Sequence, residues 1–293
     1  MAEAAVAPAP ARWVVGKPAG PTSHDIVATA RRALGRKAKV GHCGTLDPFA
    51  TGLLVLLVGR ATRLAPYLTG LDKTYLATLR TGFVSETLDP EGPITRSGDP
   101  ATFAQVRDVL PGFVGVQRQR VPALSAVRVE GERLYRKARR GEDVELPERE
   151  VTIHSLRAVE DLGDGEVTIE VRCGSGTYVR RLAGDIGDRL GCGAYCAALR
   201  RTAVGTLSVD DAVGPDKVAP RGGLDPLSGL GHLPVRRLSE EETVRVLHGG
   251  RVGYDAASGD GPVALVSDDR LVAIGTPDGT GALRPGVVLE DPR

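Results

Sequence analysis

The chain has 293 residues, of which 41% are hydrophobic and 26% are charged, and its formal net charge at pH 7 is +1. This length and composition predict one large domain and a small one with buried cores, and they argue against a fibrous or disordered chain. The longest apolar run, Leu53–Val58, is too short to cross a bilayer, and the N-terminus lacks the basic and apolar blocks of a secretion signal. We therefore expect a soluble, cytoplasmic protein.

The N-terminal part of the chain predicts a tail, a strand, a helix and a second strand. Residues 1–11 are almost entirely Ala, Pro and Val, which predicts a disordered tail. Trp13–Gly16 has the character of a short strand. Ser23 is expected to cap a helix whose apolar residues follow helical spacing and which Gly35 ends. Leu53–Val58, a continuous apolar run between two glycines, predicts a buried strand.

The middle of the chain mixes strands and helices. Tyr75–Arg80 alternates as a strand does, and Thr102–Leu110 is typical of a short helix. Ala126–Val129 is expected to be a strand that leads through a glycine into a basic helix, Glu132–Arg140.

The following region predicts a hairpin, a helix and a long strand. Val151–Leu156 and Glu166–Cys173 are expected to pair as antiparallel strands. Thr177 is expected to cap a helix that runs to Leu190, and Ala198–Val209 indicates more strand.

The C-terminal part predicts a linker and a small β-rich domain. Asp210–Gly231 is rich in Gly, Pro and Asp, which is typical of a linker. Val263–Val266, Leu271–Ile274 and Val287–Leu289 then indicate strands. Strands and helices that follow no regular alternation predict an α+β architecture.

The basic residues gather in two segments. Between Arg12 and Arg63 there are nine Lys or Arg residues and two acids, a local charge of +7. A second group comprises Arg133, Arg136, Lys137, Arg139 and Arg140. Two basic segments suit a nucleic-acid phosphate backbone, and solvated faces of ordinary surface helices are the alternative interpretation.

The cysteines predict no structural bridge. Cys43, Cys173, Cys192 and Cys196 form neither a CxxC pair nor a secreted framework. Reduced thiols are therefore favoured over disulfides or a metal site, and zinc is not expected.

One short segment, Gly41–Gly52, carries the strongest chemical signal. It places a single acid, Asp47, among glycines directly before the predicted buried strand. Pro48 restricts the backbone at Asp47, and the glycines allow a ligand or another backbone to come close. Spacing alone leaves open a turn whose Asp caps a local backbone N–H.

This segment resembles the catalytic motif of the TruB family of tRNA pseudouridine synthases, G-H-x-G-x-L-D-P-x-A-T-G, at every fixed position, with Cys43 in a variable slot. Further similarities run from Lys17 to Arg201, although the C-terminal region matches more loosely. They are Lys17-Pro18-Ala19-Gly20 with Ser23 (K-P-x-G), Asp72-Lys73-Thr74-Tyr75 (D-K-x-Y), Gly176-Thr177-Tyr178-Val179-Arg180 (G-T-Y-[IV]-R), and Leu190-Gly191-Cys192-Gly193-Ala194 (L-G-x-G-A) with Leu199-Arg200-Arg201.

The resemblance implies a pseudouridine synthase fold with a mixed, mainly antiparallel central sheet flanked by helices and loops. It places the catalytic domain at residues 12–230, with an RNA-gripping insertion at about 118–141, and a PUA-like RNA-binding domain at residues 233–293. The implied activity is conversion of uridine to pseudouridine at position 55 in the T-loop of tRNA, without a cofactor or metal. A tRNA-folding role could accompany it.

The resemblance also implies catalytic roles. Asp47 would be the nucleophile, or the base in a glycal route, and the sequence does not discriminate the two. Arg180 would pair with Asp47 and keep it ionised. Tyr75 would stack on the flipped uracil and relay a proton, whereas packing in the core is the alternative for this residue.

Other residues are expected to bind the substrate. His42 would enter the gap that the flipped nucleotide leaves, Tyr178 and Leu199 would wall the pocket, and Lys17 would support the loop or contact phosphate. Packing alone is the alternative for Tyr178. Arg133, Arg136, Lys137, Arg139 and Arg140 would contact the RNA backbone.

The expected partner is the T-arm stem-loop of tRNA, with no membrane, no guide RNA and no obligatory protein partner, and we expect a monomer. A tRNA-binding chaperone and a guide-RNA-dependent enzyme acting on ribosomal RNA are the competing hypotheses. The intact catalytic residues disfavour the first, and the insertion disfavours the second.

Overall fold

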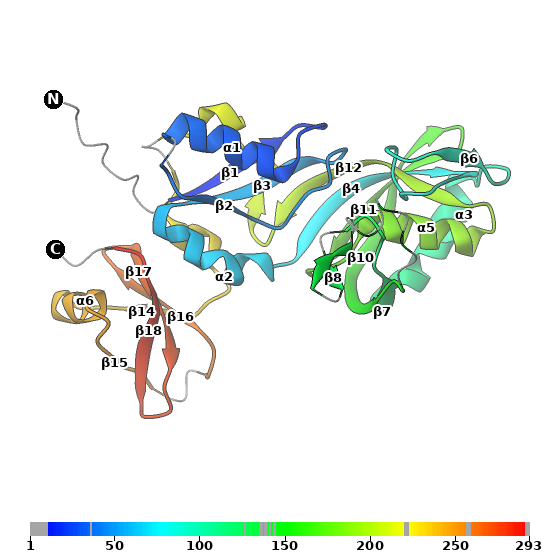
Figure 1. Cartoon of the computed structure of the whole chain (residues 1–293). Helices are drawn as coiled ribbons and strands as arrows, with labels where there is room; N and C mark the ends of the chain where they lie inside the picture. Colours follow the sequence, from blue (N-terminus) through cyan, green and yellow to red (C-terminus); the bar gives the residue numbers. More distant parts are fainter. Residues whose placement is uncertain are drawn as a thin grey trace.

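The computed structural model describes residues 11–290 except 36, 126, 130, 135, 136, 138, 139, 141, 143, 144, 220–222 and 256–258. A large mixed sheet with its helices forms the main body, and a small second sheet lies beside one end of it (Figure 1). Within these residues, none of the helices has both the length and the apolar character that a bilayer span requires. The predicted tail lies outside the described residues except for Ala11, which begins the first strand.

The main sheet has nine strands in the order β1-β3-β12-β4-β11-β10-β7, with β2 on β3 and β13 on β12. The strands are β1 (Ala11–Lys17), β2 (Val40–Cys43), β3 (Thr51–Val58), β4 (Lys73–Thr81), β7 (Gly115–Arg120), β10 (Glu148–Gly163), β11 (Glu166–Cys173), β12 (Ala194–Val204) and β13 (Leu207–Ser208). All pairings are antiparallel except β3 with β12, which run parallel. The predicted α+β class with a mainly antiparallel sheet is confirmed.

Helices and short turns connect and cover these strands. They are α1 (Ser23–Leu34), η1 (Gly59–Leu64), α2 (Ala65–Thr69), α3 (Phe103–Val109), η2 (Leu110–Phe113), α5 (Val179–Leu190), η3 (Val209–Asp211), η4 (Pro215–Lys217) and η5 (Pro226–Gly229). Two small hairpins complete the body, β5 (Phe83–Ser85) with β6 (Ile94–Arg96), and β8 (Arg128–Val129) with β9 (Glu132–Arg133).

Strand β3 is apolar throughout because both of its faces are covered. Leu54, Leu56 and Val58 pack with α1, whereas the alternate residues Leu53, Val55 and Leu57 pack with the η1–α2 turn and the C-terminal sheet. A strand buried on both sides shows a continuous apolar run instead of alternation. Strand β4, by contrast, alternates between buried and half-buried positions along its whole length.

The C-terminal sheet has the order β14-β16-β17-β18-β15. Its elements are β14 (Val235–Arg237), α6 (Glu240–Leu247), β15 (Val252–Gly253), β16 (Val263–Ser267), β17 (Arg270–Pro277) and β18 (Ala282–Val288). The three strands predicted here are confirmed, whereas α6 was not anticipated. Arg60 and Arg63 fasten this sheet to the main body, because they donate hydrogen bonds to backbone oxygens of Gly286, Val288 and Glu290.

Two predicted helix caps are wrong. Thr22, and not Ser23, caps α1 through a reciprocal pair of hydrogen bonds with Asp25. Tyr178 stands at the start of α5, which has no side-chain cap, while the Thr177 hydroxyl donates to the Gly174 backbone oxygen. Both threonine and serine suit a cap, so the sequence did not separate neighbouring candidates.

Two other predictions are corrected. The predicted basic helix Glu132–Arg140 begins too early, because Glu132–Arg133 form strand β9. Leu134 and Lys137 are helical, and Arg136 and Arg139 lie outside the described residues. The predicted linker Asp210–Gly231 is packed, because Val213 and Leu224 exchange backbone hydrogen bonds with β1. This segment therefore covers the outer edge of the main sheet.

Candidate active site

The buried side chain of Lys17 supports the loop that carries Asp47. The Lys17 side chain is 2% exposed, and its ammonium donates hydrogen bonds to the backbone oxygens of Pro18, Pro48 and Ala50 at 3.0, 2.9 and 2.6 Å. Burial lowers the pKa of Lys17 to about 8, and the charge of Asp47 opposes that shift. Lys17 thus supports the loop from inside the protein and does not line the cavity, so it is not available to contact phosphate in this structure.

Two further side chains fix the same loop. The Ser23 hydroxyl accepts a hydrogen bond from the Leu46 N–H at 2.9 Å and donates to the Leu46 oxygen at 3.1 Å. Arg201, 1% exposed on β12, donates to the backbone oxygens of Gly44 and Thr45 from one side of its guanidinium and to Leu53 from the other. The backbone on both sides of Asp47 therefore has fixed partners.

Gly52 allows this loop to meet strand β12 closely. Its φ is +102°, and a Cβ at this position would lie 2.2 Å from the Arg201 backbone oxygen. A side chain cannot occupy that space, so only glycine permits β3 and β12 to pair in parallel beside Asp47.

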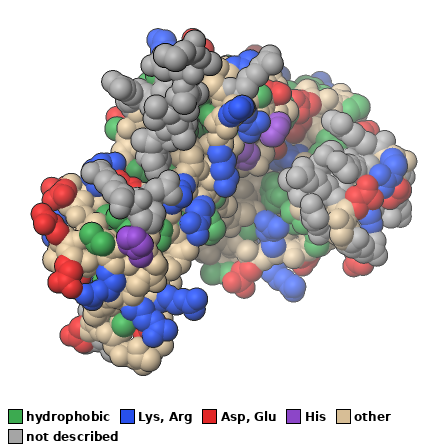
Figure 2. Space-filling model, turned by 60° about the vertical axis from the view of Figure 1, so that its left-hand side comes forward, with side chains coloured by type: hydrophobic (Ala, Val, Ile, Leu, Met, Phe, Trp, Pro, Cys, Tyr) green, Lys and Arg blue, Asp and Glu red, His purple; other side chains and the backbone are tan. Residues whose placement is uncertain are grey.

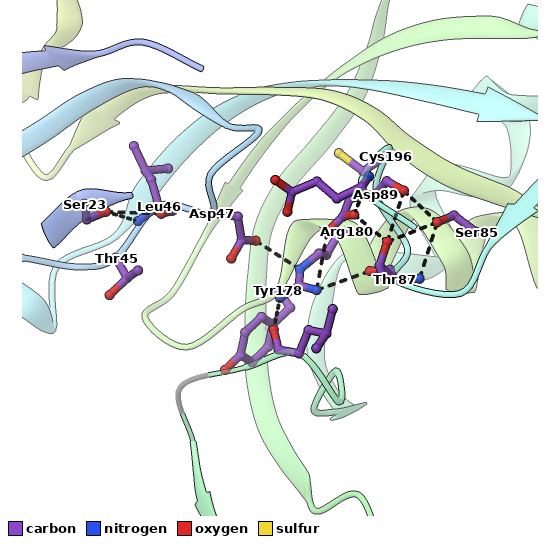
Figure 3. Close-up of polar contacts among 12 residues, drawn as sticks. Ser23, Thr45, Leu46, Asp47, Ser85, Thr87, Asp89, Tyr178, Arg180 and Cys196 are labelled. Atoms are coloured by element: carbon purple, nitrogen blue, oxygen red, sulfur yellow. Dashed lines mark hydrogen bonds and ion pairs between the residues drawn. The ribbon is translucent and has the colours of Figure 1, made fainter. Parts of the chain in front are cut away.

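Arg180 of α5 lies at the centre of the charged groups (Figure 3). Its Nε is 3.0 Å from an Asp47 carboxylate oxygen, and its Nη1 is 3.6 Å from a carboxylate oxygen of Asp89. Nη1 also donates to the Thr87 backbone oxygen at 3.2 Å, and Nη2 donates to the Leu124 oxygen at 2.6 Å. The structure thus brings the Arg180 guanidinium and the Asp47 carboxylate together.

The surroundings of Asp47 act on its charge in opposite directions. Burial raises the pKa of Asp47 above its usual range, the Arg180 guanidinium lowers it, and the nearby Asp89 carboxylate raises it again. Arg180 is 2% exposed, whereas the Asp47 side chain is 32% exposed. The arginine is thus a buried support, and the carboxylate reaches the cavity.

Asp47 faces a cavity of about 610 Å³. Its walls come from distant parts of the chain: the Asp47 loop, β4, the loop after β5, the segment that follows β7, the β11–α5 loop with the start of α5, and β12. The predicted residues that line it are Asp47, Tyr75, Tyr178, Arg180 and Leu199.

The two tyrosines stand in different environments. Tyr75 is 8% exposed, and burial raises the pKa of its hydroxyl, so that the ring stays neutral. The Tyr178 ring is half-buried beside two guanidiniums, whose carbons lie 5.6 Å (Arg149) and 5.9 Å (Arg180) from the ring centroid. Both rings line the cavity, so packing does not account for their whole surface.

His42 does not line this cavity. It lies on β2 opposite Leu56, and burial together with the charge of Arg201 lowers the pKa of its imidazole. The ring is therefore held in its neutral form, which suits stacking better than ion pairing.

The first basic segment is less available to a partner than its charge suggests. Arg12 and Lys17 are each 2% exposed, and Arg60 and Arg63 donate to the C-terminal sheet. Among the residues that the structure describes, Arg31 is half-buried, and the exposed ones are Arg32, Lys37, Lys39, Arg60 and Arg63. Figure 2 shows Lys and Arg side chains gathered along a hollow on one face of the molecule.

The second basic group is only partly described. Arg140 makes a two-point contact with Glu132 at 2.8 Å and a contact with Glu142 at 2.6 Å. Lys137 is described and half-buried, whereas Arg136, Arg139 and the side chain of Arg133 lie outside the described residues.

Several cavity residues were missed from the sequence. Asp89, Glu91, Lys73, Leu124 and Arg201 line the same space. The segments of the resemblance include Lys73 and Arg201 without a role for either, and none of those segments contains Asp89. Asp89 is 2% exposed, and its carboxylate accepts local hydrogen bonds from the Thr87 hydroxyl and the Glu91 N–H. Its charged partner, Arg180 at 3.6 Å, lies far along the chain.

The four cysteines are free thiols and are all buried: Cys43, Cys173, Cys192 and Cys196. Burial raises the pKa of Cys43 and Cys173 to about 11 each, so these thiols are protonated and unreactive near neutral pH.

Comparisons with known proteins point to one family. The family profile "TruB family pseudouridylate synthase (N terminal domain)" matches residues 31–179, and "tRNA pseudouridylate synthase B C-terminal domain" matches residues 180–220. The chain is 45% identical over 292 residues to tRNA pseudouridine synthase B of Synechococcus sp. (strain WH7803), covering 94% of this chain and 96% of that one. It is 44% identical over 287 residues to the protein of the same name from Thermobifida fusca (strain YX), covering 94% and 97%.

A solved structure shows the same fold. A chain in the structure of an H/ACA RNP bound to a substrate RNA containing 2′-deoxyuridine superposes with a TM-score of 0.72 at 23% identity, covering 96% of this chain and 85% of that one. The match extends over the main body and the C-terminal sheet together.

Proposed function

The chain belongs to the TruB family of pseudouridylate synthases, and we propose that it converts uridine to pseudouridine in tRNA, at position 55 of the T-loop. The observation that carries this proposal is the contact of 3.0 Å between the buried Arg180 and the accessible Asp47 carboxylate in a cavity of about 610 Å³. Cavities of this size hold a small ligand such as one nucleoside.

The reaction moves uracil from an N1 to a C5 glycosidic bond. The C1′–N1 bond breaks, the base turns within the cavity, the C1′–C5 bond forms, and the proton on C5 is lost while N1 becomes protonated. Asp47 either attacks C1′ or removes a ribose proton, and its ionised form is needed in both routes. Arg180 fixes the direction of the carboxylate and favours its charge.

The cavity walls suit the detached base. Tyr75 offers a buried neutral ring for stacking and a protonated hydroxyl that can relay the C5 proton. Tyr178 and Leu199 confine the base from other sides. No group in this scheme needs a cofactor.

Extrusion of the nucleotide is assigned to residues outside the cavity. His42, whose ring is neutral, would enter the gap that the flipped uridine leaves in the base stack. This contact would offset part of the unstacking cost of about a few kcal/mol. Lys17 is proposed to act indirectly, because its ammonium is committed to the loop oxygens.

RNA binding is proposed to involve two further regions. The insertion at about 118–141 would grip the RNA backbone through Arg133, Arg136, Lys137, Arg139 and Arg140, although Arg140 must first exchange its carboxylate partners for phosphate. Residues 233–293 are proposed as a PUA-like RNA-binding domain. Its seven arginines are outnumbered by ten acids, so we expect specific contacts from it and not a general basic surface.

The experiment is an assay of the purified protein on unmodified tRNA transcript with no guide RNA. Formation of pseudouridine at position 55 is the expected result. Binding without turnover would favour a tRNA chaperone, and a requirement for guide RNA would favour the ribonucleoprotein class of enzyme; either result would overturn the proposal.

A further inference from the structure

The side-chain amide of Gln119 pairs with the backbone of Tyr178. Gln119 is 4% exposed at the end of β7. Its Nε2 donates to the Tyr178 oxygen at 3.0 Å, and its Oε1 accepts from the Tyr178 N–H at 2.8 Å. An amide that satisfies both backbone groups of one residue takes the place of a neighbouring strand.

This pairing lies at a structurally weak point. Tyr178 begins α5 and provides no side-chain cap, so the first turn of the helix lacks the usual local support. Arg180 follows two residues later. Because the backbone of Tyr178 sets the direction of the first turn, Gln119 controls where the Arg180 side chain leaves the helix.

The neighbouring strand reinforces this grip. Arg149 of β10 lies opposite Gln119 in the ladder, and its guanidinium stacks 5.6 Å from the centroid of the Tyr178 ring. Its Nη1 also donates to the Gly176 oxygen at 3.4 Å. The backbone and the ring of Tyr178 are therefore held by two adjacent strands.

The chain that continues from β7 holds the other end of Arg180. Five residues after Gln119, the Leu124 oxygen accepts a hydrogen bond of 2.6 Å from Arg180 Nη2. One segment thus fixes the arginine both at its backbone, through Tyr178, and at its guanidinium, through Leu124.

We propose that Gln119 is a positioning residue for the reaction, which holds the start of α5 so that Arg180 meets the Asp47 carboxylate. This inference rests on the proposed function for its catalytic meaning, but the positioning itself is measurable without substrate. Gln119 touches neither the cavity nor the reacting atoms.

The variants Gln119→Leu and Gln119→Asn test the proposal. Leucine keeps the approximate size and removes both hydrogen bonds, whereas asparagine keeps the amide but is one methylene too short to make both. Gln117→Leu is the matched control, because Gln117 is a half-buried residue on the same face of the same strand.

The first readout is the titration of Asp47 in protein labelled with ¹³C at aspartate carboxyls, with its resonance identified by its loss in Asp47→Asn. The groups that act on Asp47 come from α5, β1, β4, β12 and the loop after β5, and they are Arg180, Lys17, Tyr75, Cys196, Asp89 and Glu91. Loss of Arg180 from its position should move the Asp47 titration to higher pH in both Gln119 variants and leave it unchanged in Gln117→Leu.

The second readout is the single-turnover rate with enzyme in excess over tRNA. We expect it to fall about tenfold to a hundredfold in Gln119→Leu, while the dissociation constant for tRNA stays within about threefold. If Gln119→Leu does not fold, Gln119→Asn carries both measurements.

A folded Gln119 variant whose Asp47 titrates as in the wild type would overturn the inference, even if its melting temperature were lower. Because the titration needs no RNA, it is independent of the proposed function. Failure of the wild-type protein to modify tRNA would count against that function alone.

Discussion

Charged side chains serve different ends in the cavity and in the basic segment from Arg12 to Arg63. In the cavity, Arg180 and Asp47 come from positions far apart in the sequence and meet at 3.0 Å. In the basic segment, residues close together in the sequence point to different partners. Arg12 and Lys17 are buried, and the exposed Arg60 and Arg63 donate to backbone oxygens of the C-terminal sheet. The functional contacts therefore arise from tertiary structure, and local charge overstates the surface offered to RNA.

The difference also separates two kinds of sequence signal. A motif marks a position whose partners are fixed by the fold, so Asp47 and Arg180 could be paired before the structure was known. A count of charges has no information about partners, and it treated the buried Lys17 and the exposed Lys39 alike.

The largest effect is expected from Arg180→Met, which leaves two carboxylates without their common cation. We expect the single-turnover rate to fall at least about a thousandfold. The free energy of unfolding should fall by roughly 3–5 kcal/mol, chiefly because of the buried Asp89, since Asp47 is partly exposed. Denaturant unfolding measures the loss of stability, and a single-turnover assay measures the loss of rate.

The double variant Arg180→Met with Asp89→Asn is the control for that prediction. It should regain part of the stability and none of the activity. An active Arg180→Met enzyme would mean that the pair in the cavity is structural only.

Lys17→Met should have the next largest effect. Methionine fills similar space but leaves the Pro18 and Ala50 oxygens without their donor. We expect a loss of roughly 1–3 kcal/mol in unfolding free energy together with a slower reaction, because the Asp47 loop loosens. Unchanged stability with weaker tRNA binding would show instead that Lys17 contacts phosphate.

Asp89→Asn should change the pH dependence of the reaction. The rate falls on the acid side as Asp47 becomes protonated, and the Asp89 charge raises the pKa of Asp47. Removal of that charge lowers the pKa of Asp47, so the acid limb of the single-turnover profile should move to lower pH. A shift to higher pH would mean that Asp89 acts mainly by orienting Arg180.

The smallest effects compare two residues of the basic segment. Lys39→Ala removes an exposed charge, and we expect the slope of log affinity against log salt to decrease by about 0.7–0.9, the value of one phosphate contact. Arg63→Ala should leave that slope unchanged and lower the melting temperature, because Arg63 binds the C-terminal sheet. Equal changes of slope in both variants would mean that both side chains contact phosphate, as the local charge of the segment alone suggests.

Much of the fold could be predicted from the sequence because the hydrophobic pattern is strong where burial is one-sided or complete. Strand β4 and helix α1 show clear periods, and β3 shows the unbroken run of a doubly covered strand. Details that depend on distant partners could not be predicted. Ser23 was expected to cap α1 but binds the Leu46 backbone, a residue on another segment.

The same reason limits the prediction of the site. Asp47, Tyr75 and Arg180 lie in motifs, whereas Asp89 and Gln119 gain their roles only from residues that the fold brings near. Gln119 is a single polar residue in a polar stretch, and nothing in its neighbours indicates that Tyr178 will face it. The 4% exposure of its side chain is what reveals it.

The measurement that tests the central claim most directly compares Asp47→Asn with the wild type in single-turnover pseudouridine formation and in tRNA binding. Asparagine keeps the size of the side chain and removes the carboxylate that both chemical routes need. We predict no detectable product and a dissociation constant within about tenfold of the wild type, because backbone contacts dominate affinity. Product formation at the wild-type rate would contradict the account.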